Sequence, residues 1–550
     1  MNSLTMYKNG FSKALITGLI LMAFAGRAAA QVSKVWVSDK GNGTYQNPIL
    51  NADYSDPDAI RVGNDYYMVS SSFNCMPGLP ILHSNDLVNW QLINYALKKQ
   101  EPTAVYDLPQ HGKGVWAPCI RYHNNEFYIY YPDPDYGIYM VKTKNPAGDW
   151  EKPVLVLPGK GIIDPAPFWD NDGKAYLGVA WAGSRAGVNS LITVFRMNPV
   201  GTAVTDDGTH VYDGHGKNHT IEGPKFYKRN SYYYILAPAG GVATGWQLAL
   251  RSKSIYGPYE AKVVMDQGKT KVNGPHQGAL VETQTGEPWF IHFQDKGVYG
   301  RVVHLQPVKW VSDWPVIGND TDGDGKGEPV FIHKKPNIGV VYPIQTPAEG
   351  DEFNGDKTGL QWQWYANPKI QWSAQIRGTG YLRLFAYPQD KNSANLWNTP
   401  NLLLQKLPAP DFTATTKVKY QVEWEAGEGK KAGLLMMGND YTYISISKND
   451  QGYKLNTVVC KNAMDGTAEE ITDEKRIKNA EVYLRIKVSA PDAVCAFSYS
   501  EDGTSFTPIG KEFTAMPDKW IGSKVGLFCI SKSDVRMGGY ADFDWFRVDK

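Results

Sequence analysis

The sequence predicts an all-β protein: a five-bladed β-propeller followed by an antiparallel β-sandwich. Three observations lead to this fold. A two-strand motif occurs five times in the first part of the chain, alternating strands and glycine turns fill the rest, and no amphipathic helical period persists. At 550 residues the chain is too long for one ordinary domain and suggests two or three.

Each of the five repeats consists of a short strand, a polar turn and a strand rich in aromatic residues. The repeats open roughly 50–60 residues apart, the period expected of propeller blades. Because the innermost strands of a propeller surround one axis, the residues that open them converge. We therefore expect five side chains to meet at one place: Asp56, Trp116, Asp164, Glu222 and His276.

These openings also have a purely structural interpretation. Asp-Pro and Glu-Gly-Pro are common turn sequences, and the aromatic runs are best explained by packing between strands. Turn capping does not, however, require an acid in each repeat. Three carboxyl groups at equivalent places in successive repeats favour a functional site.

The first 30 residues have the pattern of a secretory signal. Lys8 and Lys13 form the positive region, residues 14–26 the apolar core, and residues 28–30 a small-residue cleavage site. The apolar run is too short for an ordinary membrane span, so we expect none in the mature chain. The prediction is an exported protein, periplasmic or extracellular, with an uncleaved anchor as the alternative.

The charge balance argues against a nucleic-acid partner. Removal of residues 1–30 lowers the basic residues from 57 to 54 against 56 acids, a formal charge of −2. A nearly neutral chain lacks the basic footprint that nucleic acids require. The oligomeric state is not readable from the sequence.

Five cysteines are spread thinly, and no two have the spacing of metal ligands. Export permits a disulfide, Cys460–Cys495 or Cys75–Cys119, and the sequence does not choose between them. Because the number is odd, at least one thiol stays unpaired in a monomer, and we expect it to be buried.

The propeller pattern ends near residues 310–314. We place the propeller at residues 31–343, a linker at 344–349 and the sandwich at 350–550. The sandwich is predicted from evenly spaced strands: Thr415–Trp424, Gly433–Met437, Tyr441–Ser447, Val482–Val488, Ala496–Tyr499, Val525–Ile530 and Asp542–Val548. Its tryptophans, Trp362, Trp364 and Trp372, can form a sugar platform, but burial at the sandwich edge is favoured.

A glycine-rich loop before the linker is a candidate structural calcium site. Asp320, Asp322 and Asp324 stand at positions one, three and five of a calcium loop, and Gly325 stands at position six. The twelfth position is Phe331 rather than glutamate, and no flanking helices are evident. The alternative is an Asp/Gly turn cluster.

The convergent acids suit glycoside hydrolysis, which needs one protonated and one ionised carboxyl group on opposite sides of the bond. A third acid can raise the pKa of the proton donor and orient it. Asp56, Asp164 and Glu222 match these roles in number and type. Phe73 and Trp116 can stack on a sugar ring, and Arg301 can donate to sugar hydroxyls or else form a structural salt bridge.

Several segments resemble glycoside hydrolase family 43, in its β-xylosidase and α-L-arabinofuranosidase branch: residues 47–58, 83–90, 115–118 and 220–224. This resemblance implies a five-bladed propeller and an inverting hydrolase. It assigns Asp56 as general base, Glu222 as general acid and Asp164 as the residue that modulates the pKa of the acid. It also implies that Arg301 touches substrate and that His276 lies under the site, where it can contact calcium or water.

The second domain resembles the concanavalin-like C-terminal module of that branch, in residues 351–354, 362–364, 432–435, 500–503 and 524–528. Two residues depart from the family pattern. Ser55 replaces a common proline, and Asp58 replaces a small hydroxyl residue. The extra acid leaves open which aspartate holds the water, and Asp56 is favoured.

The sequence therefore predicts an exported inverting hydrolase that releases terminal xylose or arabinofuranose from xylan- or arabinoxylan-derived saccharides of the plant cell wall. We expect no cofactor to be required. The alternatives are a hydrolase of arabinan or β-1,3-galactan in the same family and a non-catalytic carbohydrate-binding protein. For inversion, the carboxyl groups of Asp56 and Glu222 should lie about 6.5–9.5 Å apart.

Overall fold

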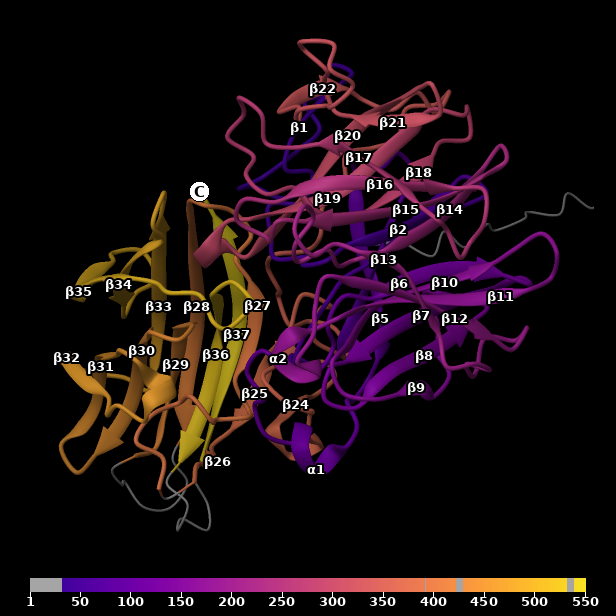
Figure 1. The fold of residues 1–550 in the computed structure, drawn as a ribbon. Coiled ribbons are helices and arrows are strands. Elements are labelled where there is room, and N and C mark those ends of the chain that lie inside the picture. The colour runs from indigo at the N-terminus through magenta and orange to yellow at the C-terminus, as the bar shows by residue number, and fades with distance from the viewer. Residues whose placement is uncertain (1–31, 391, 422–428, 532–538) are drawn as a thin grey trace, which may run out of the picture.

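The computed structural model describes residues 32–550 except 391, 422–428 and 532–538. The described chain is almost entirely β-structure and forms two bodies that lie side by side (Figure 1). The predicted signal segment, residues 1–30, lies outside the described residues. Within those described residues, no helix has both the length and the apolar character needed to cross a membrane.

The first body is a propeller of five four-stranded antiparallel blades, as predicted. Blade 1 contains β2 (Asp58–Val62), β3 (Asp65–Val69), β4 (Gly78–Ser84) and β5 (Trp90–Leu97). Blade 2 contains β6 (Cys119–His123), β7 (Glu126–Asp133), β8 (Gly137–Thr143) and β9 (Val154–Pro158). Blade 3 contains β10 (Ile162–Trp169), β11 (Ala175–Trp181), β12 (Leu191–Met197) and β13 (Thr209–Asp213). Blade 4 contains β14 (Lys225–Arg229), β15 (Tyr232–Ala239), β16 (Trp246–Ser252) and β17 (Glu260–Met265). Blade 5 contains β18 (His276–Glu282), β19 (Pro288–Asp295), β20 (Arg301–Val311) and β21 (Trp314–Ile317).

The polar turns set the hairpins of the blades. In blade 2, His123 pairs with Glu126, so that Asn124 and Asn125 form a two-residue loop. Both asparagines have positive φ angles, 49° and 61°. This is the type I′ geometry that matches strand twist, and asparagine tolerates it better than most residues.

The aromatic runs are packing residues, as predicted. Tyr128 and Tyr130 of blade 2 are buried against Leu177 and Val179 of blade 3. Full burial of one such side chain stabilises the fold by about 1.5–3 kcal/mol. The blades are thus held together by side chains, because no hydrogen-bonded ladder links one blade to the next among the described strands.

The innermost strands of neighbouring blades contact one another: β2 contacts β6, and β10 contacts β6 and β14. The ring closes where β2 of blade 1 contacts β18 of blade 5. The N-terminal segment strengthens the closure. Leu50 pairs with Val303 of blade 5, and the Asn47 side chain both donates to and accepts from the backbone of Leu305. A small ladder of β1 (Thr44–Gln46) and β22 (Ile332–Lys334) lies beside this junction.

The second body is a sandwich of two mainly antiparallel sheets (Figure 1). One sheet has the order β23 (Gln363–Trp364), β27 (Leu403–Lys406), β36 (Lys524–Ser531), β29 (Lys431–Met437), β30 (Tyr441–Asn449), β31 (Gly452–Cys460) and β32 (Glu470–Ile477), with β26 (Tyr387–Pro388) parallel to β36. The other has the order β24 (Ser373–Gln375), β25 (Leu382–Phe385), β37 (Tyr540–Asp549), β28 (Phe412–Gln421), β33 (Glu481–Ser489), β34 (Val494–Ser500) and β35 (Thr507–Thr514). All seven predicted strands correspond to observed strands, although residues 422–424 of the first lie outside the described residues.

Alternation of side chains explains the sandwich core. Along β33, Val482, Leu484, Ile486 and Val488 are buried between the sheets, and the residues between them are half-buried or exposed. This period of two is the pattern of a strand with one face toward a core.

Two other expectations about buried residues have clear outcomes. Trp362 and Trp372 are buried, which favours packing over a sugar platform, and Trp364 is half-buried beside Trp372. All five cysteines are unpaired and buried, so neither candidate disulfide forms. They act as small apolar residues.

The short helices lie in connections: α1 (Thr103–Tyr106), α2 (Gly183–Ala186), η1 (Gly297–Tyr299), η2 (Ile370–Trp372) and η3 (Ala463–Asp465). No helix or strand is assigned between β22 and β23. The predicted linker at 344–349 falls in this stretch, and the three domain boundaries remain predictions. Ser33 bonds to Thr346 and Glu349 there.

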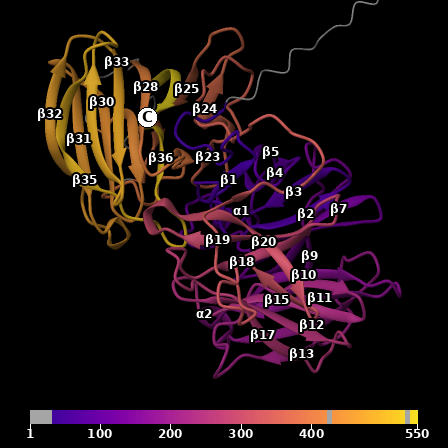
Figure 2. The ribbon, with the colours of Figure 1, turned by 90° about the horizontal axis from the view of Figure 1, so that it is seen from above.

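The two bodies lie side by side (Figure 2), and hydrogen bonds and apolar side chains join them. Met76 and Trp364 exchange two backbone hydrogen bonds of 2.9 and 2.6 Å across the interface. Phe73 and Cys75 of blade 1 pack in one apolar cluster with Tyr365 and Leu404. The sandwich therefore packs against the side of the propeller that carries Phe73.

Candidate active site

The openings of the inner strands bring the predicted site residues together. One pocket, with a volume of about 290 Å³, is lined by all seven of them: Asp56, Phe73, Trp116, Asp164, Glu222, His276 and Arg301. It lies where the five blades meet. The residues come from four different blades and the connection between blades 1 and 2, so the propeller assembles a site from distant parts of the chain.

The backbone at the openings has an unusual conformation. Asp56 and Asp164 have φ angles of 53° and 55°, in the left-handed region that side chains with a Cβ avoid. Such positions cost on the order of 1–3 kcal/mol and cluster at functional sites. In β10 the pairing with β11 also shifts between Ile163 and Ala166, which leaves Asp164 in a bulge. Bulges of this kind redirect a side chain.

Asp56 is held by two donors. The Ser71 hydroxyl donates to one carboxylate oxygen at 2.5 Å, and Nη1 of Arg301 donates to the other at 3.0 Å. Both of its oxygens therefore have a fixed direction. A carboxylate oriented in this way can hold a water molecule in a defined position.

Asp164 is the most buried of the three acids, with 2% of its surface exposed. Its Oδ2 accepts from the Gly223 backbone N–H at 2.7 Å and from Nε2 of Gln277 at 3.1 Å. Burial, followed by the nearby Glu222 and Asp56 charges, raises the pKa of Asp164 to about 8, against the opposing charge of Lys225. Because Gly223 directly follows Glu222, this contact also fixes the backbone that carries Glu222.

Glu222 faces the pocket with a side chain 31% exposed. Its backbone N–H donates to Pro238 of β15 at 3.1 Å. Its Oε1 lies 3.3 Å from Nε2 of His276, without hydrogen-bond alignment. Of the three acids it is the one within reach of solvent, which suits an exchange of protons with a substrate oxygen.

Aromatic side chains and Arg301 form the walls. The Phe73 and Trp116 rings lie 6.5 Å apart, and Trp116 lies 6.5 Å from Trp520 in an edge arrangement. Arg301 is buried and packs over Phe293 at 4.8 Å. Its ion pair with Asp56 is a salt bridge, as in the structural interpretation. Contact between Arg301 and substrate remains a prediction.

Asp58, the extra acid, does not reach the pocket. It is fully buried, and its Oδ2 accepts from Nη1 of Arg121 and from the Ile120 backbone N–H, both at 2.7 Å. Asp58 thus joins blade 1 to blade 2 as an ion pair. The question of which aspartate faces the pocket is settled by position: Asp56 lines it and Asp58 does not.

Among the residues that the sequence did not predict, four bear on the geometry of the site. Ser71 and Gln277 bond directly to Asp56 and Asp164. Asp53 bonds to the backbone of Arg301 at 3.0 Å. Trp520 lines the pocket from the second domain. Gln277 follows His276 directly, so its place in the repeat was a usable signal, whereas nothing in the sequence near Trp520 relates it to the blades.

His276 is buried, and its ring nitrogens have no hydrogen-bond partner within the described chain. Its neighbouring acid is Glu222, and calcium prefers six to eight oxygen ligands. This donor set does not by itself form a calcium site. The role of His276 as a metal ligand remains a prediction.

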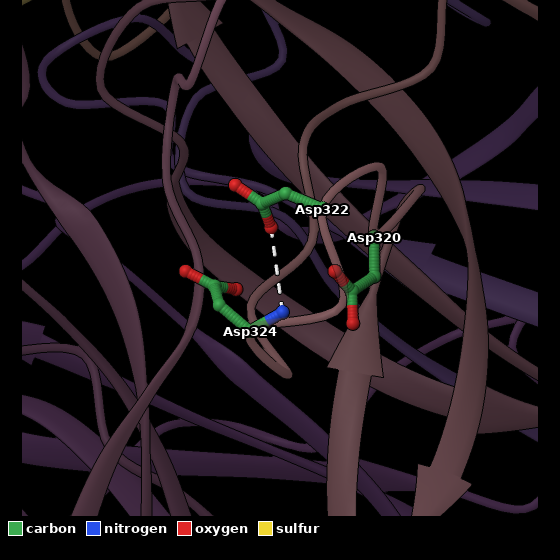
Figure 3. A group of neighbouring side chains, drawn as sticks. All are labelled: Asp320, Asp322 and Asp324. Atoms are coloured by element: carbon green, nitrogen blue, oxygen red, sulfur yellow. Dashed lines mark hydrogen bonds between the residues drawn. The ribbon is translucent and has the colours of Figure 1, made fainter.

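The only group of three candidate metal-binding side chains among the described residues is the loop cluster Asp320, Asp322 and Asp324 (Figure 3). Their ligand oxygens lie within 4.8 Å of one another. Asp320 accepts backbone N–H groups from Gly323 and Gly325, and Asp322 accepts one from Asp324. The carboxylates of the loop are therefore partly satisfied by hydrogen bonds from the loop backbone. Calcium binding there also remains a prediction.

Fold and site together define a propeller hydrolase with carboxyl groups gathered at the axis, and the comparisons identify the family. Residues 45–315 match the glycosyl hydrolases family 43, and residues 350–549 match the β-xylosidase C-terminal concanavalin A-like domain. The chain belongs to glycoside hydrolase family 43, as the sequence resemblance indicated.

Three relatives illustrate the family match. A putative β-xylosidase of Xylanibacter ruminicola is 41% identical over 501 residues, which cover 90% of this chain and 88% of that protein. A non-reducing end α-L-arabinofuranosidase of Bacteroides ovatus is 29% identical, with 92% and 94% covered. The crystal structure of a xylan β-1,4-xylosidase from Bacillus halodurans has a TM-score of 0.80 at 25% identity, covering 92% of this chain and all of that one.

Proposed function

We propose that this protein is an exported inverting glycosidase that removes terminal xylose or arabinofuranose from xylan- or arabinoxylan-derived saccharides. The observation that carries the proposal is the pocket itself. Three carboxyl groups, the rings of Phe73, Trp116 and Trp181, and a buried arginine line a space of about 290 Å³. The second domain narrows this space with Trp520. Relatives named as a β-xylosidase and an α-L-arabinofuranosidase support both sugars.

In the proposed reaction, Glu222 gives its proton to the bridging oxygen as the glycosidic bond breaks. Asp56 takes a proton from a water molecule, which attacks the anomeric carbon from the opposite face. The electron pair of the broken bond stays with the leaving oxygen, and the sugar is released with inverted configuration. Afterwards the proton returns from Asp56 to Glu222 through solvent.

Asp164 would serve this reaction in two ways. Its carboxyl group lies close enough to Glu222 that charge on one disfavours charge on the other, so the pair retains a proton that isolated acids would have lost. Its hydrogen bond to the Gly223 N–H also orients the backbone of Glu222. The first effect keeps a proton within the pair, and the second holds Glu222 in place at the pocket.

Terminal release is favoured over internal cleavage by the shape of the site. An internal cleavage site needs an open groove that accepts a chain on both sides. Here Trp520 adds a wall that the propeller lacks, and Trp116 and Arg301 lie within ring-contact distances of it. An arabinan- or galactan-degrading hydrolase remains the second candidate, and a non-catalytic binding protein would have no need for the Asp164–Gly223 contact.

The test is a substrate panel for the mature protein. Xylosyl, arabinofuranosyl, arabinan and β-1,3-galactan oligosaccharides would be incubated with it and the released sugars identified by chromatography. We expect single xylose or arabinose units from the non-reducing end, and proton NMR of the first product should show inverted configuration. Release of internal fragments, of galactose, or of product with retained configuration would contradict the proposal.

Export is tested separately. Expression of the full chain in a bacterium, followed by fractionation and N-terminal sequencing, should give a periplasmic or extracellular protein that begins near residue 31. A chain that keeps residues 1–30 would contradict it.

A further inference from the structure

Asp53 lies at the contact between the two domains, where it bonds to the backbones of Arg301 in the propeller and Gly522 in the sandwich. It follows β1 and precedes the catalytic opening by three residues. Only 3% of its surface is exposed. A buried aspartate needs partners for its charge, because burial of an unpaired carboxylate is costly.

The partners of Asp53 come from both domains. Its Oδ1 accepts from the Arg301 backbone N–H at 3.0 Å and from the Ser55 hydroxyl at 3.0 Å. Its Oδ2 accepts from the Gly522 backbone N–H at 3.0 Å. One carboxylate therefore bonds to the residue that holds Asp56 and to the segment that carries Trp520.

Two lysines of the sandwich provide the balancing charge. Burial acts to raise the pKa of Asp53, but the Lys406 and Lys524 charges and the two backbone N–H groups hold it below its usual value. Burial in turn lowers the pKa of Lys406 to about 8, with the Lys524 charge acting in the same direction. The charge of Asp53 is thus stabilised by the other domain.

The backbones at this joint approach too closely for any side chain. A Cβ on Gly300 would lie 2.3 Å from the Asp53 carboxyl carbon, and a Cβ on Gly522 would lie 2.5 Å from the Gly300 nitrogen. Ser523 also donates its backbone N–H to Val298 at 2.8 Å. The segment 520–523 is therefore seated directly on the turn that leads into Arg301.

We propose that Asp53 is a positioning residue that couples the second domain to catalysis by holding Arg301 and the Trp520 segment in one fixed arrangement. It acts through the two backbones and does not itself line the pocket. The pocket is then complete only when the domains are docked. This inference rests on the proposed function, because it assigns Trp520 and Arg301 to the same sugar site.

The experiment is a double-mutant cycle between Asp53→Asn and Trp520→Ala, with kinetics on an aryl β-xyloside and an aryl α-L-arabinofuranoside. Each single change should raise KM by about tenfold and lower kcat by less. Because one of the two contacts of Asp53 acts through the Trp520 segment, the double variant should raise KM by clearly less than the product of the two single effects. Independent effects would instead multiply to about a hundredfold and would overturn the proposal.

The matched control is Asp170→Asn. Asp170 is another buried aspartate of the propeller, paired with Lys228 and bonded to the Tyr233 hydroxyl, and it does not line the pocket. A purely structural role for Asp53 predicts that both variants lower the melting temperature and leave KM unchanged. An unchanged KM in Asp53→Asn would therefore reject the positioning role.

A second variant keeps the proposal testable if Asp53→Asn does not fold. Gly522→Ala keeps the charge of Asp53 but places a methyl group against the Gly300 nitrogen, which pushes the same joint apart. It should raise KM in the same way, and a normal KM would contradict the inference. A wild-type protein that hydrolyses neither glycoside would refute the proposed function instead. In that case, calorimetry would measure the binding of xylose and arabinose to the same variants and so test the coupling between Asp53 and the Trp520 segment. Sugar binding that is unaffected by Asp53→Asn would reject the positioning role.

Discussion

The molecule carries two groups of three acidic side chains, and they differ in how they are built. Asp320, Asp322 and Asp324 lie within five residues of one exposed loop. Asp56, Asp164 and Glu222 come from three blades and meet in one pocket. The loop group is close in sequence and bonds to its own backbone, whereas the pocket group is assembled by the fold.

This difference has an electrostatic consequence. The loop carboxylates accept local N–H groups, and salt screens charges at an exposed surface. In the pocket, burial and the mutual repulsion of the acids raise the pKa of Asp164 to about 8. Acid clustering in the sequence is thus a poor guide to reactivity, and convergence into a buried site is a better one.

The largest contrast should appear when one acid of each group is neutralised. Glu222→Gln removes the proton donor and should lower kcat on an unactivated xylo-oligosaccharide by about 10³-fold or more, with little change in melting temperature. Asp322→Asn, the matched change in the loop, should leave kcat within about twofold. Near-normal hydrolysis by Glu222→Gln would remove the assigned role of Glu222.

A second contrast separates the two aspartates of the first opening. Asp58→Asn leaves the Arg121 guanidinium buried without a counter-charge and should lower the free energy of unfolding by about 3–5 kcal/mol. Denaturant titration measures this loss. The double variant Asp58→Asn with Arg121→Met should recover part of it. Since Asp58 does not line the pocket, the folded fraction should keep its KM, and a large rise in KM would show that Asp58 acts on substrate.

The sequence sufficed for the parts of the fold that repeat. Strand–turn–strand units with a regular period predicted the blades, and their equivalent openings predicted Asp56, Asp164 and Glu222 as neighbours. Alternation along residues 482–488 predicted a sandwich strand. These features depend on local patterns that are visible in a single amino-acid sequence.

The rest of the site depends on contacts between distant segments, which no local pattern encodes. Trp520 enters the pocket because the sandwich docks on the propeller. Asp53 lies in an irregular segment, and its significance comes from Gly522, far away in the sequence. Asp58 looked like a second candidate base until the structure paired it with Arg121.

The burial of Asp164 predicts a pH-dependent trade between stability and activity. Its pKa in the folded state, about 8, lies above the ordinary carboxyl value, so the folded protein binds the proton more tightly than the unfolded chain. Stability from this group is therefore fully present below about pH 4 and is lost as the pH rises toward 8. Asp164→Asn removes the charge and should melt at a higher temperature than the wild type at pH 8. Its free energy of unfolding should be higher there by on the order of 2 kcal/mol, with little difference at pH 4. Its activity should fall by about 10–100-fold, and equal melting curves at both pH values would contradict the buried-charge account.

The smallest effect is expected from removal of divalent cations. Asp320, Asp322 and Asp324 already accept backbone N–H groups, and Lys326 lies 3.8 Å from Asp324 as an internal cation, so calcium has to displace existing partners. We expect a chelator to change kcat by less than about twofold and the melting temperature by no more than about 2 °C, because the loop does not line the pocket.

Added calcium should have equally little effect on wild type and on Asp322→Asn. A rise in melting temperature with calcium that is lost in Asp322→Asn would instead make the loop a metal site, while a loss of activity without that rise would direct attention to His276.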